Sequence, residues 1–187
     1  MNTTLVYLGV GVVGGAVLAY AIVIFGLRQG PLWMACHYGL KTLARLLIDK
    51  GADMEARDRI SGFTPLHVAA MGKRVAILRL LVQKGANVNA KDNTGWTPLH
   101  WAAIEGPSQS VMLLVQNGAD VNVMDNQGWT PLHRAAIEDN VETLDALLQS
   151  GAQVSVRTHA GATPLVIAIR CSSRRAAEVL RSQGGSE

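Results

Sequence analysis

Apolar residues occur in short blocks along residues 31–187, and polar turns separate the blocks. In one block the apolar residues are Ile77, Leu78, Leu81 and Val82. This spacing places all four side chains on one face of an α-helix. Gly85 follows the block and suits the left-handed conformation that ends many helices. The pattern therefore predicts short amphipathic helices that end at a glycine and are joined by polar turns.

The blocks repeat at a fixed distance. Proline recurs at a constant interval, at Pro65, Pro98, Pro131 and Pro164. A glycine follows each proline, again at one constant distance, at Gly85, Gly118, Gly151 and Gly184. A period of this length is typical of a solenoid, in which each repeat is too small to bury a core alone and stacks on its neighbours. A solenoid of this kind is expected to bind a partner through its surface rather than to catalyse a reaction.

The helix starts carry one motif in three copies. The first copy reads Thr64-Pro65-Leu66-His67-Val68-Ala69-Ala70, and the others run from Thr97 to Ala103 and from Thr130 to Ala136. Threonine can cap the free N–H groups of the first turn, and proline at the first helical position loses no hydrogen bond. These motifs resemble the ankyrin repeat, whose signature joins a Thr-Pro-Leu-His-x-Ala-Ala helix start to a Gly-Ala-Asp-Val-Asn turn.

The resemblance implies an all-α solenoid of about five helix-turn-helix repeats, whose hairpin-like turns form fingers beside a concave binding groove. The repeats are expected at about 31–63, 64–96, 97–129, 130–162 and 163–187. The first and last copies are degenerate, because Trp33 and Val166 replace the histidine. One additional residue falls between Gly51 and Pro65. Terminal repeats need an outer face that tolerates water, so such departures are expected.

Three histidines, His67, His100 and His133, occupy the same position of successive repeats. Neighbouring helix pairs stack about 10 Å apart, whereas zinc binds nitrogen at about 2 Å, so these side chains cannot share one ion. The resemblance implies instead that each histidine bonds to its threonine and to the neighbouring turn. No nucleophile is paired with a base, and no Gly-rich phosphate loop precedes a lysine. We therefore expect no catalysis, no metal and no cofactor.

Residues 5–27 form an uninterrupted stretch without a charged side chain, after a short tail at residues 1–4. Because about 20 apolar residues span a bilayer, we expect a transmembrane helix here. A linker at 28–30 then leads to the ankyrin domain at 31–187. The alternative is a cleaved signal peptide, which would leave a secreted or periplasmic ankyrin protein. A signal peptide prefers a basic N-terminal region and a shorter apolar core than this stretch offers.

The basic residues nearest the apolar stretch all follow it, at Arg28, Lys41, Arg45 and Lys50. The positive-inside rule then places the ankyrin domain in the cytosol, matrix or stroma, with the N-terminus on the outer, lumenal or intermembrane side. Within the stretch, Gly11, Gly15 and Ala19 recur at every fourth position, on one helix face. Small residues at this spacing let another transmembrane helix approach closely, whether from a second copy or from a different protein.

Charge and cysteine content narrow the choice of partners. The net charge of +3 is modest and does not indicate nucleic-acid binding. Cys36 and Cys171 belong to the first and last repeats, too far apart for a disulfide, and two unpaired cysteines fit a reducing compartment. Basic residues concentrate in the last repeat, where we expect a solvated cap, with an acidic partner or anionic lipid as the alternative. They are Arg170, Arg174, Arg175 and Arg181.

Aromatic residues mark the candidate binding surface. Trp96 and Trp129 precede Thr-Pro, at a turn position equivalent to Phe63. Trp101 follows its histidine, at the position that Arg134 occupies in the next repeat. The resemblance places these residues on the groove or finger side, where exposed tryptophan is enriched among binding hot spots. Packing between neighbouring turns is the alternative role for the two finger tryptophans.

The same surface is expected to include residues near the ends of the first helices, namely Ile104, Glu105, Ile137 and Glu138. A groove of mixed apolar and charged side chains suits a protein partner better than nucleic acid, which favours Lys and Arg with stacking aromatics. Two functions stay open. The chain is either a tethered adapter that recruits a soluble protein, or an accessory subunit of a membrane assembly such as a respiratory or photosynthetic complex.

Overall fold

The structure is a computed structural model, and it describes residues 30–186. Within this range the chain forms ten α-helices and no β-strand. The helices are α2 (Pro31–Tyr38), α3 (Lys41–Asp49), α4 (Pro65–Met71), α5 (Val75–Gln83), α6 (Pro98–Glu105), α7 (Ser108–Gln116), α8 (Pro131–Ile137), α9 (Val141–Gln149), α10 (Pro164–Arg170) and α11 (Arg174–Ser182).

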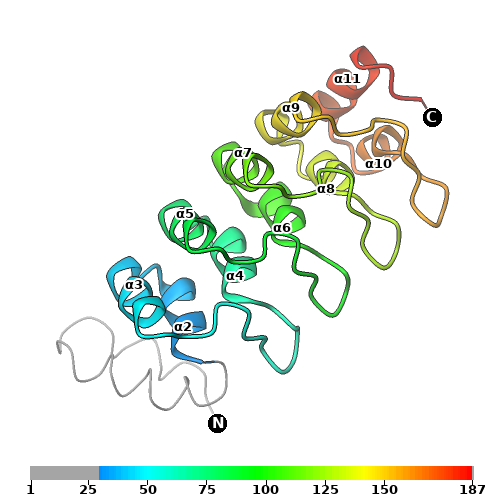
Figure 1. The fold of residues 1–187 in the computed structure, drawn as a ribbon. Coiled ribbons are helices and arrows are strands. Elements are labelled where there is room, and N and C mark those ends of the chain that lie inside the picture. The colour runs from blue at the N-terminus through cyan, green and yellow to red at the C-terminus, as the bar shows by residue number, and fades with distance from the viewer. Residues whose placement is uncertain (1–29, 187) are drawn as a thin grey trace, which may run out of the picture.

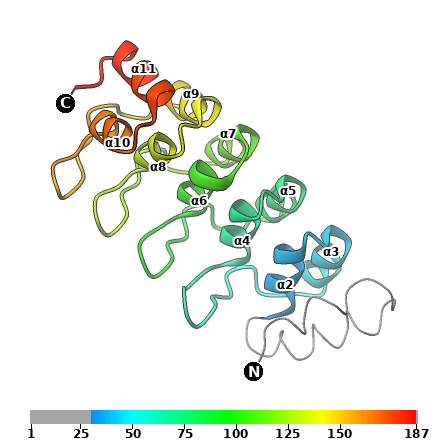
Figure 2. The same ribbon diagram turned by 180° about the vertical axis from the view of Figure 1, so that it is seen from behind.

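The helices pair in chain order, and Figures 1 and 2 show the pairs stacked side by side in one row. One layer contains α2, α4, α6, α8 and α10, each in contact with the next. The second layer contains α3, α5, α7, α9 and α11. Long loops project as fingers from one side of the row. The predicted all-α solenoid is confirmed for residues 30–186.

The predicted transmembrane helix, with its small-residue face of Gly11, Gly15 and Ala19, lies outside the described residues. Among residues 30–186, no helix is long and apolar enough to cross a membrane. The longest helices of that range contain nine residues, whereas a bilayer requires about 20.

The predicted threonines start the first helix of each full repeat. Thr64, Thr97, Thr130 and Thr163 all have extended backbone angles, and proline is the first helical residue after each. Proline fixes its φ near the helical value and its missing N–H costs nothing at this position. The local sequence therefore favours a helix start at these positions, and packing between repeats stabilises the short helices.

A glycine in the left-handed region follows the second helix of each repeat. The φ angles are +86° at Gly51, +90° at Gly85, +89° at Gly118, +92° at Gly151 and +81° at Gly184. A Cβ atom on Gly85 would meet no other atom within 4 Å. The glycine is therefore required by the backbone conformation rather than by space, and the predicted helix ends are confirmed.

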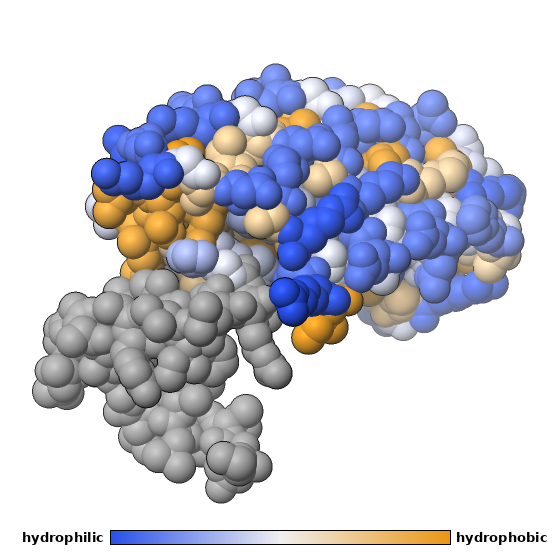
Figure 3. Space-filling model, turned by 60° about the horizontal axis from the view of Figure 1, so that its bottom comes forward, coloured by the Kyte–Doolittle hydropathy of each residue, from blue (hydrophilic) through white to orange (hydrophobic). Residues whose placement is uncertain are grey.

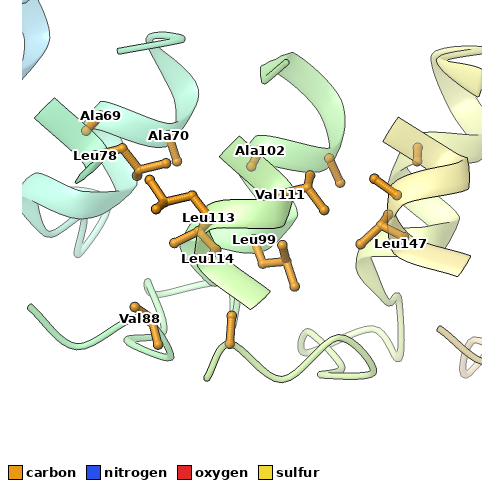
Figure 4. Packing of buried hydrophobic residues seen from close by; sticks show 14 of the residues in the cluster. Ala69, Ala70, Leu78, Val88, Leu99, Ala102, Val111, Leu113, Leu114 and Leu147 are labelled. Atoms are coloured by element: carbon orange, nitrogen blue, oxygen red, sulfur yellow. The ribbon is translucent and has the colours of Figure 1, made fainter. Parts of the chain in front are cut away.

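Leucines at equivalent positions of the repeats form the core. They are Leu66, Leu99, Leu132 and Leu165 in the first helices, and Leu81, Leu114, Leu147 and Leu180 in the second. The paired alanines Ala102 and Ala103 have no exposed surface, which lets α6 approach its neighbours closely. Figure 4 shows side chains of α4 to α7 gathered between the helices. The core is one continuous strip that runs through the whole stack.

The repeat histidines connect each repeat to the next. His100 is fully buried, and its Nδ1 lies 3.1 Å from the backbone nitrogen of Thr97. Its Nε2 lies 3.0 Å from the carbonyl oxygen of Trp129 in the following finger. Because a carbonyl can only accept, Nε2 carries the hydrogen and Nδ1 accepts from the Thr97 N–H. His67 and His133 are held in the same way, so the predicted structural role of these histidines is confirmed.

Burial lowers the pKa of all three histidines. For His100 it lowers the pKa from 6.5 to about 4, although the hydrogen bond to the Trp129 carbonyl acts in the opposite direction. The folded protein therefore keeps these imidazoles neutral at pH values where an unfolded chain protonates them.

The last repeat has a polar outer surface, as predicted. On α11, Arg174, Arg175 and Glu178 are exposed, and Arg175 lies 3.8 Å from Glu142 of α9. Cys36 is buried in α2, where burial raises the pKa of its thiol to about 12. Cys171 is exposed after α10, at the other end of the stack. Both thiols are free, which agrees with the expectation that they are too far apart to pair.

We expect the free energy of unfolding to decrease as the pH is lowered from 6.5 to about 4. In this window the unfolded chain binds a proton at His100 and the folded chain does not, so acid favours unfolding. For His100 alone the effect amounts to about 3 kcal/mol at pH 4. Urea unfolding of the full chain in mild detergent, followed by circular dichroism, would measure it.

His100→Gln is the matched variant, because an amide can replace both hydrogen bonds without titrating. Between pH 7 and about 4.5 this variant should lose about 2 kcal/mol less stability than the natural chain. An equal loss would contradict the role of His100. Asp58 and Asp125 do not interfere, because their pKa values are lowered below 3.8 and their contributions are lost only in stronger acid.

Candidate interaction surface

An aspartate closes the turn of each of the first three fingers, at Asp58, Asp92 and Asp125, and Thr158 replaces it in the fourth. Asp92 Oδ1 accepts from the backbone N–H groups of Thr94 (2.8 Å) and Trp96 (2.9 Å). Asp125 Oδ1 accepts from the N–H of Trp129 at 2.9 Å in the same way. Because the carboxylate holds the backbone of the aromatic residue, it fixes the point from which the indole extends toward the helices.

Neighbouring fingers are joined by backbone hydrogen bonds. The Asn126 N–H donates to the Thr94 carbonyl at 3.1 Å, and the Asn93 N–H donates to the Ser61 carbonyl at 3.0 Å. Gly95 has φ +83°, and a Cβ atom there would come within 2.5 Å of Asn126 Oδ1. The finger glycine therefore permits both the turn and the close approach of the next finger.

Side chains form one continuous row between the fingers and the first helices, in the order Phe63, Trp101, Trp96, Arg134 and Trp129. The Trp101 ring lies 5.2 Å from the Phe63 ring, edge to face, and 4.5 Å from the Trp96 ring. Arg134 Cζ lies 4.1 Å from the centre of the Trp96 ring and 4.3 Å from that of Trp129. Trp101 and Arg134 thus each lie between the aromatic rings of two successive fingers. We call these five residues the aromatic–arginine row.

The finger aspartates also accept hydrogen bonds from the polar groups of Arg134 and Trp101 in this row. The Arg134 Nη2 donates to Asp125 Oδ2 at 2.6 Å, with side chains that are 13% and 1% exposed. The Trp101 Nε1–H donates to Asp92 Oδ2 at 3.3 Å. Burial acts to raise the pKa of Asp125, but the Trp129 N–H and Arg134 outweigh it and hold the pKa below its ordinary value. The positive charge of Arg134 is therefore balanced by the Asp125 carboxylate.

A cleft of about 530 Å³ opens over the middle of the row, at Trp96, Trp101 and Arg134, whereas Phe63 and Trp129 do not line it. Its lining consists of Asn93, Thr94, Trp96, Trp101, Asp125, Asn126, Gln127 and Arg134. Indole and amide groups dominate this lining, and its single positive and single negative charge are paired. Such a surface offers apolar contact and hydrogen bonds but no net positive charge for a phosphate.

A family model described as ankyrin repeats in three copies matches residues 32–125, 90–158 and 110–187. These stretches together cover most of the chain. The chain belongs to the ankyrin-repeat family. A search of curated proteins finds no match. Proteins of the ankyrin-repeat family are generally non-catalytic modules that bind other proteins, which makes protein interaction the role of this fold.

Not every predicted binding residue of this ankyrin-repeat protein lies in the row. The other four, Ile104, Glu105, Ile137 and Glu138, lie at or just beyond the C-terminal ends of α6 and α8, away from the cleft lining. Glu105 lies 3.9 Å from Lys73 of the preceding repeat, with both side chains exposed. The Ile137 carbonyl accepts from the Ser173 hydroxyl at 2.8 Å. Their roles in binding stay predictions.

The residues predicted from the sequence for this surface do not include Asp92, Asp125, Asn93, Asn126 or Gln127. A signal was present, because Asp-Asn-x-Gly-Trp-Thr-Pro occurs at both 92–98 and 125–131. The aspartates close the fingers and the asparagines join them. The Trp96 ring also stacks on the His100 ring, with centres 6.0 Å apart, and the Trp129 ring lies tilted against the His133 ring at 5.8 Å. The two finger tryptophans therefore have a structural role in addition to any binding role.

No group of three or more side chains that could hold a metal ion occurs in the part of the chain that the structure describes. The buried histidines there use both ring nitrogens in hydrogen bonds, Nδ1 with the threonine of the same repeat and Nε2 with a carbonyl of the following finger. No described arrangement of side chains assigns a cofactor to this surface.

We expect Arg134→Lys to lower the free energy of unfolding by about 1–2 kcal/mol, because an ammonium group cannot stack flat between two indoles while pairing with Asp125. Urea unfolding in mild detergent measures the change. Arg79→Lys on α5 is the control, since Arg79 is exposed. Equal stability of the two variants would show that the stacked geometry of Arg134 contributes nothing.

Proposed function

We propose that this chain is a membrane-anchored ankyrin-repeat protein that binds a protein partner through the cleft over the aromatic–arginine row. The row supports this because tryptophan and arginine are enriched among binding hot spots, and Trp96, Trp101 and Arg134 all line one open cleft. Finger and helix hydrogen bonds hold these side chains in place before binding, which reduces the ordering cost on association.

The chemistry of the cleft favours a peptide segment that offers an apolar side chain together with backbone groups. The apolar side chain would lie against the half-buried indole groups of Trp96 and Trp101 where they line the cleft. The backbone groups would meet the amides of Asn93, Asn126 and Gln127 at the rim. Nucleic acid fits less well, because its phosphates would meet Asp125 and an arginine that is already paired.

The anchor is the apolar stretch at residues 5–27, whose length and lack of charge support a membrane span. The linker at 28–30 is short, so the proposed arrangement holds the first repeat close to the bilayer on the cytosolic, matrix or stromal side. Gly11 and Gly15 support contact with a further transmembrane helix, as in an accessory subunit of a membrane complex. The alternative within the same proposal is a free-standing tethered adapter.

One experiment distinguishes these two forms. The full chain is extracted from its own membrane in mild detergent, and the native mass of the particle that contains it is measured. A large complex of fixed stoichiometry would identify an accessory subunit, whereas a monomer or dimer would identify an adapter. Replacing both Gly11 and Gly15 with Ile should release an accessory subunit from its complex, because the larger side chains prevent close helix packing. A complex that survives both changes would contradict packing through this face. A mature N-terminus near Ile22 would contradict the anchor itself.

Trp101→Ala should weaken binding of the co-purified partner by about 2 kcal/mol, or about 30-fold in Kd, if Trp101 is a hot spot. Titration of the purified partner against the full chain gives the affinity. Met112→Ala on α7 is the control, because Met112 is exposed and does not line the cleft. Gln127→Arg adds bulk at the rim without altering a buried side chain and should also weaken binding. Unchanged affinity in both cleft variants would overturn this site.

A further inference from the structure

Exposed apolar side chains concentrate in the first repeat. Ile60 is 83% exposed, Leu46 is 55% exposed and Tyr38 is 50% exposed, the highest values among the large apolar side chains of the described residues. Figure 3 shows an apolar patch over the first helix pair, where α2 and α3 lie at the end of the row. An exposed apolar surface at the end of a solenoid is typical of a site that contacts another molecule or a membrane.

Leu46 occupies a position that is buried in the three middle repeats. The equivalent residues in α5, α7 and α9 are Leu80, Leu113 and Ala146, which are 4%, 7% and 8% exposed. Each of those helices lies against the second helix of the preceding repeat. Among the described residues, no helix precedes α3 in that layer, so a side chain of the interior type faces outward.

The two ends of the solenoid therefore differ. On α11 the outer surface presents Arg174, Arg175 and Glu178, which water can solvate. On α3 the exposed surface includes Leu46, with the half-buried Leu43 and Leu47 beside it on the helix. Terminal repeats of a water-exposed solenoid need polar outer faces. The C-terminal end meets this requirement, whereas the N-terminal end exposes Leu46 among the charged residues Lys41, Arg45 and Asp49.

Ile60 lies at the tip of the first finger, and this finger is longer than the others. Asp58 holds the N–H of Phe63, five residues on, at 2.8 Å, whereas Asp92 holds that of Trp96, four residues on, at 2.9 Å. The additional residue of the first repeat therefore lies in the fingertip. The exposed Arg57 and Arg59 precede the exposed Ile60, and the buried Asp58 lies between the two arginines. A finger with two basic residues next to one large apolar side chain suits the lipid–water boundary.

The chain before α2 indicates what covers this end. Only the linker at 28–30 separates the charge-free stretch at 5–27 from Pro31. As a helix, residues 5–27 would extend about 35 Å, whereas α2 and α3 are each about 13 Å long. The first helix pair could therefore cover less than half of that stretch. A bilayer accommodates all of it and lies within reach of the first repeat.

We propose that the outer surface of the first repeat, at Leu46 of α3 and at the fingertip residue Ile60, lies against the lipid surface of the membrane. This inference rests on the anchor in the proposed function and adds a second, peripheral contact to it. In the first repeat the exposed basic residues outnumber the exposed acidic ones, which leaves an excess of positive charge that can pair with lipid phosphates. The basic residues are Lys41, Arg45, Lys50, Arg57 and Arg59, and the acidic ones are Asp49, Asp53 and Glu55. Contact at this end would fix the orientation of the solenoid relative to the membrane. It would also leave the cleft of the later repeats open to a partner.

The test uses the full chain in vesicles of phosphatidylcholine and phosphatidylglycerol. Cys171→Ser removes the exposed thiol, and Cys36 stays unlabelled because it is buried. Single cysteines at Leu46, Ile60, Met112 and Val17 each carry a polarity-sensitive fluorophore, and nitroxide lipids quench any probe that enters the bilayer. Met112 is the control, because its exposure of 48% is similar to that of Leu46 and it lies on α7 of the third repeat.

Nitroxide lipids should reduce the fluorescence at Leu46→Cys and Ile60→Cys about twofold or more and leave Met112→Cys unchanged, because interfacial side chains lie about 5–10 Å into the headgroup region. Quenching at Val17→Cys alone would overturn this inference and leave the anchor intact. A probe at Leu46→Cys that is shielded from water but not quenched would show a protein cover, such as a second copy, and would also overturn it. No quenching at Val17→Cys would overturn the anchor itself. Ile60→Cys lies on an exposed fingertip, so its result does not depend on any change in the core.

Discussion

The constraint behind this structure is that a pair of helices with seven to nine residues each cannot bury its own apolar face. Each pair therefore stacks on the next, and the leucines and alanines of successive repeats join into one core. The buried histidines make the stacking specific, because each one binds its own helix start through Nδ1 and the following finger through Nε2. One side chain thus fixes the helix start and the distance to the next repeat.

The same regular stacking builds the candidate binding surface. Equivalent positions come into line, so the finger aromatic residues alternate with Trp101 and Arg134 in a single row. The finger aspartates serve two purposes there, because Asp125 holds the turn with one oxygen and pairs with Arg134 through the other. The contacts that form this surface also stabilise the fold, so its side chains are held in place before a partner binds. This favours binding without rearrangement.

The two ends of the stack meet different surroundings. The C-terminal end carries charged side chains on α11, whereas the N-terminal end exposes Leu46 and Ile60. In an ordinary solenoid both ends face water, and both are polar. The apolar end of this chain adjoins the charge-free stretch at 5–27, so the exposed side chains and the proposed anchor lie at the same end of the protein.

Local sequence specifies the repeat, its period and the family resemblance, because Thr-Pro starts and left-handed glycines act over short stretches of chain. The hydrogen bonds of the histidines were predicted as well, but from the family resemblance and not from a local pattern. Packing between repeats determines which of the predicted residues meet. It placed Trp101 and Arg134 between the aromatic rings of neighbouring fingers, and it left Glu105 and Glu138 apart from the cleft. The position of Arg134 depends on Trp96, which lies in an earlier finger, far away along the chain, and no local pattern encodes that contact. The exposure of Leu46 likewise depends on whether a neighbouring helix covers it, which is a property of the stack rather than of the residue.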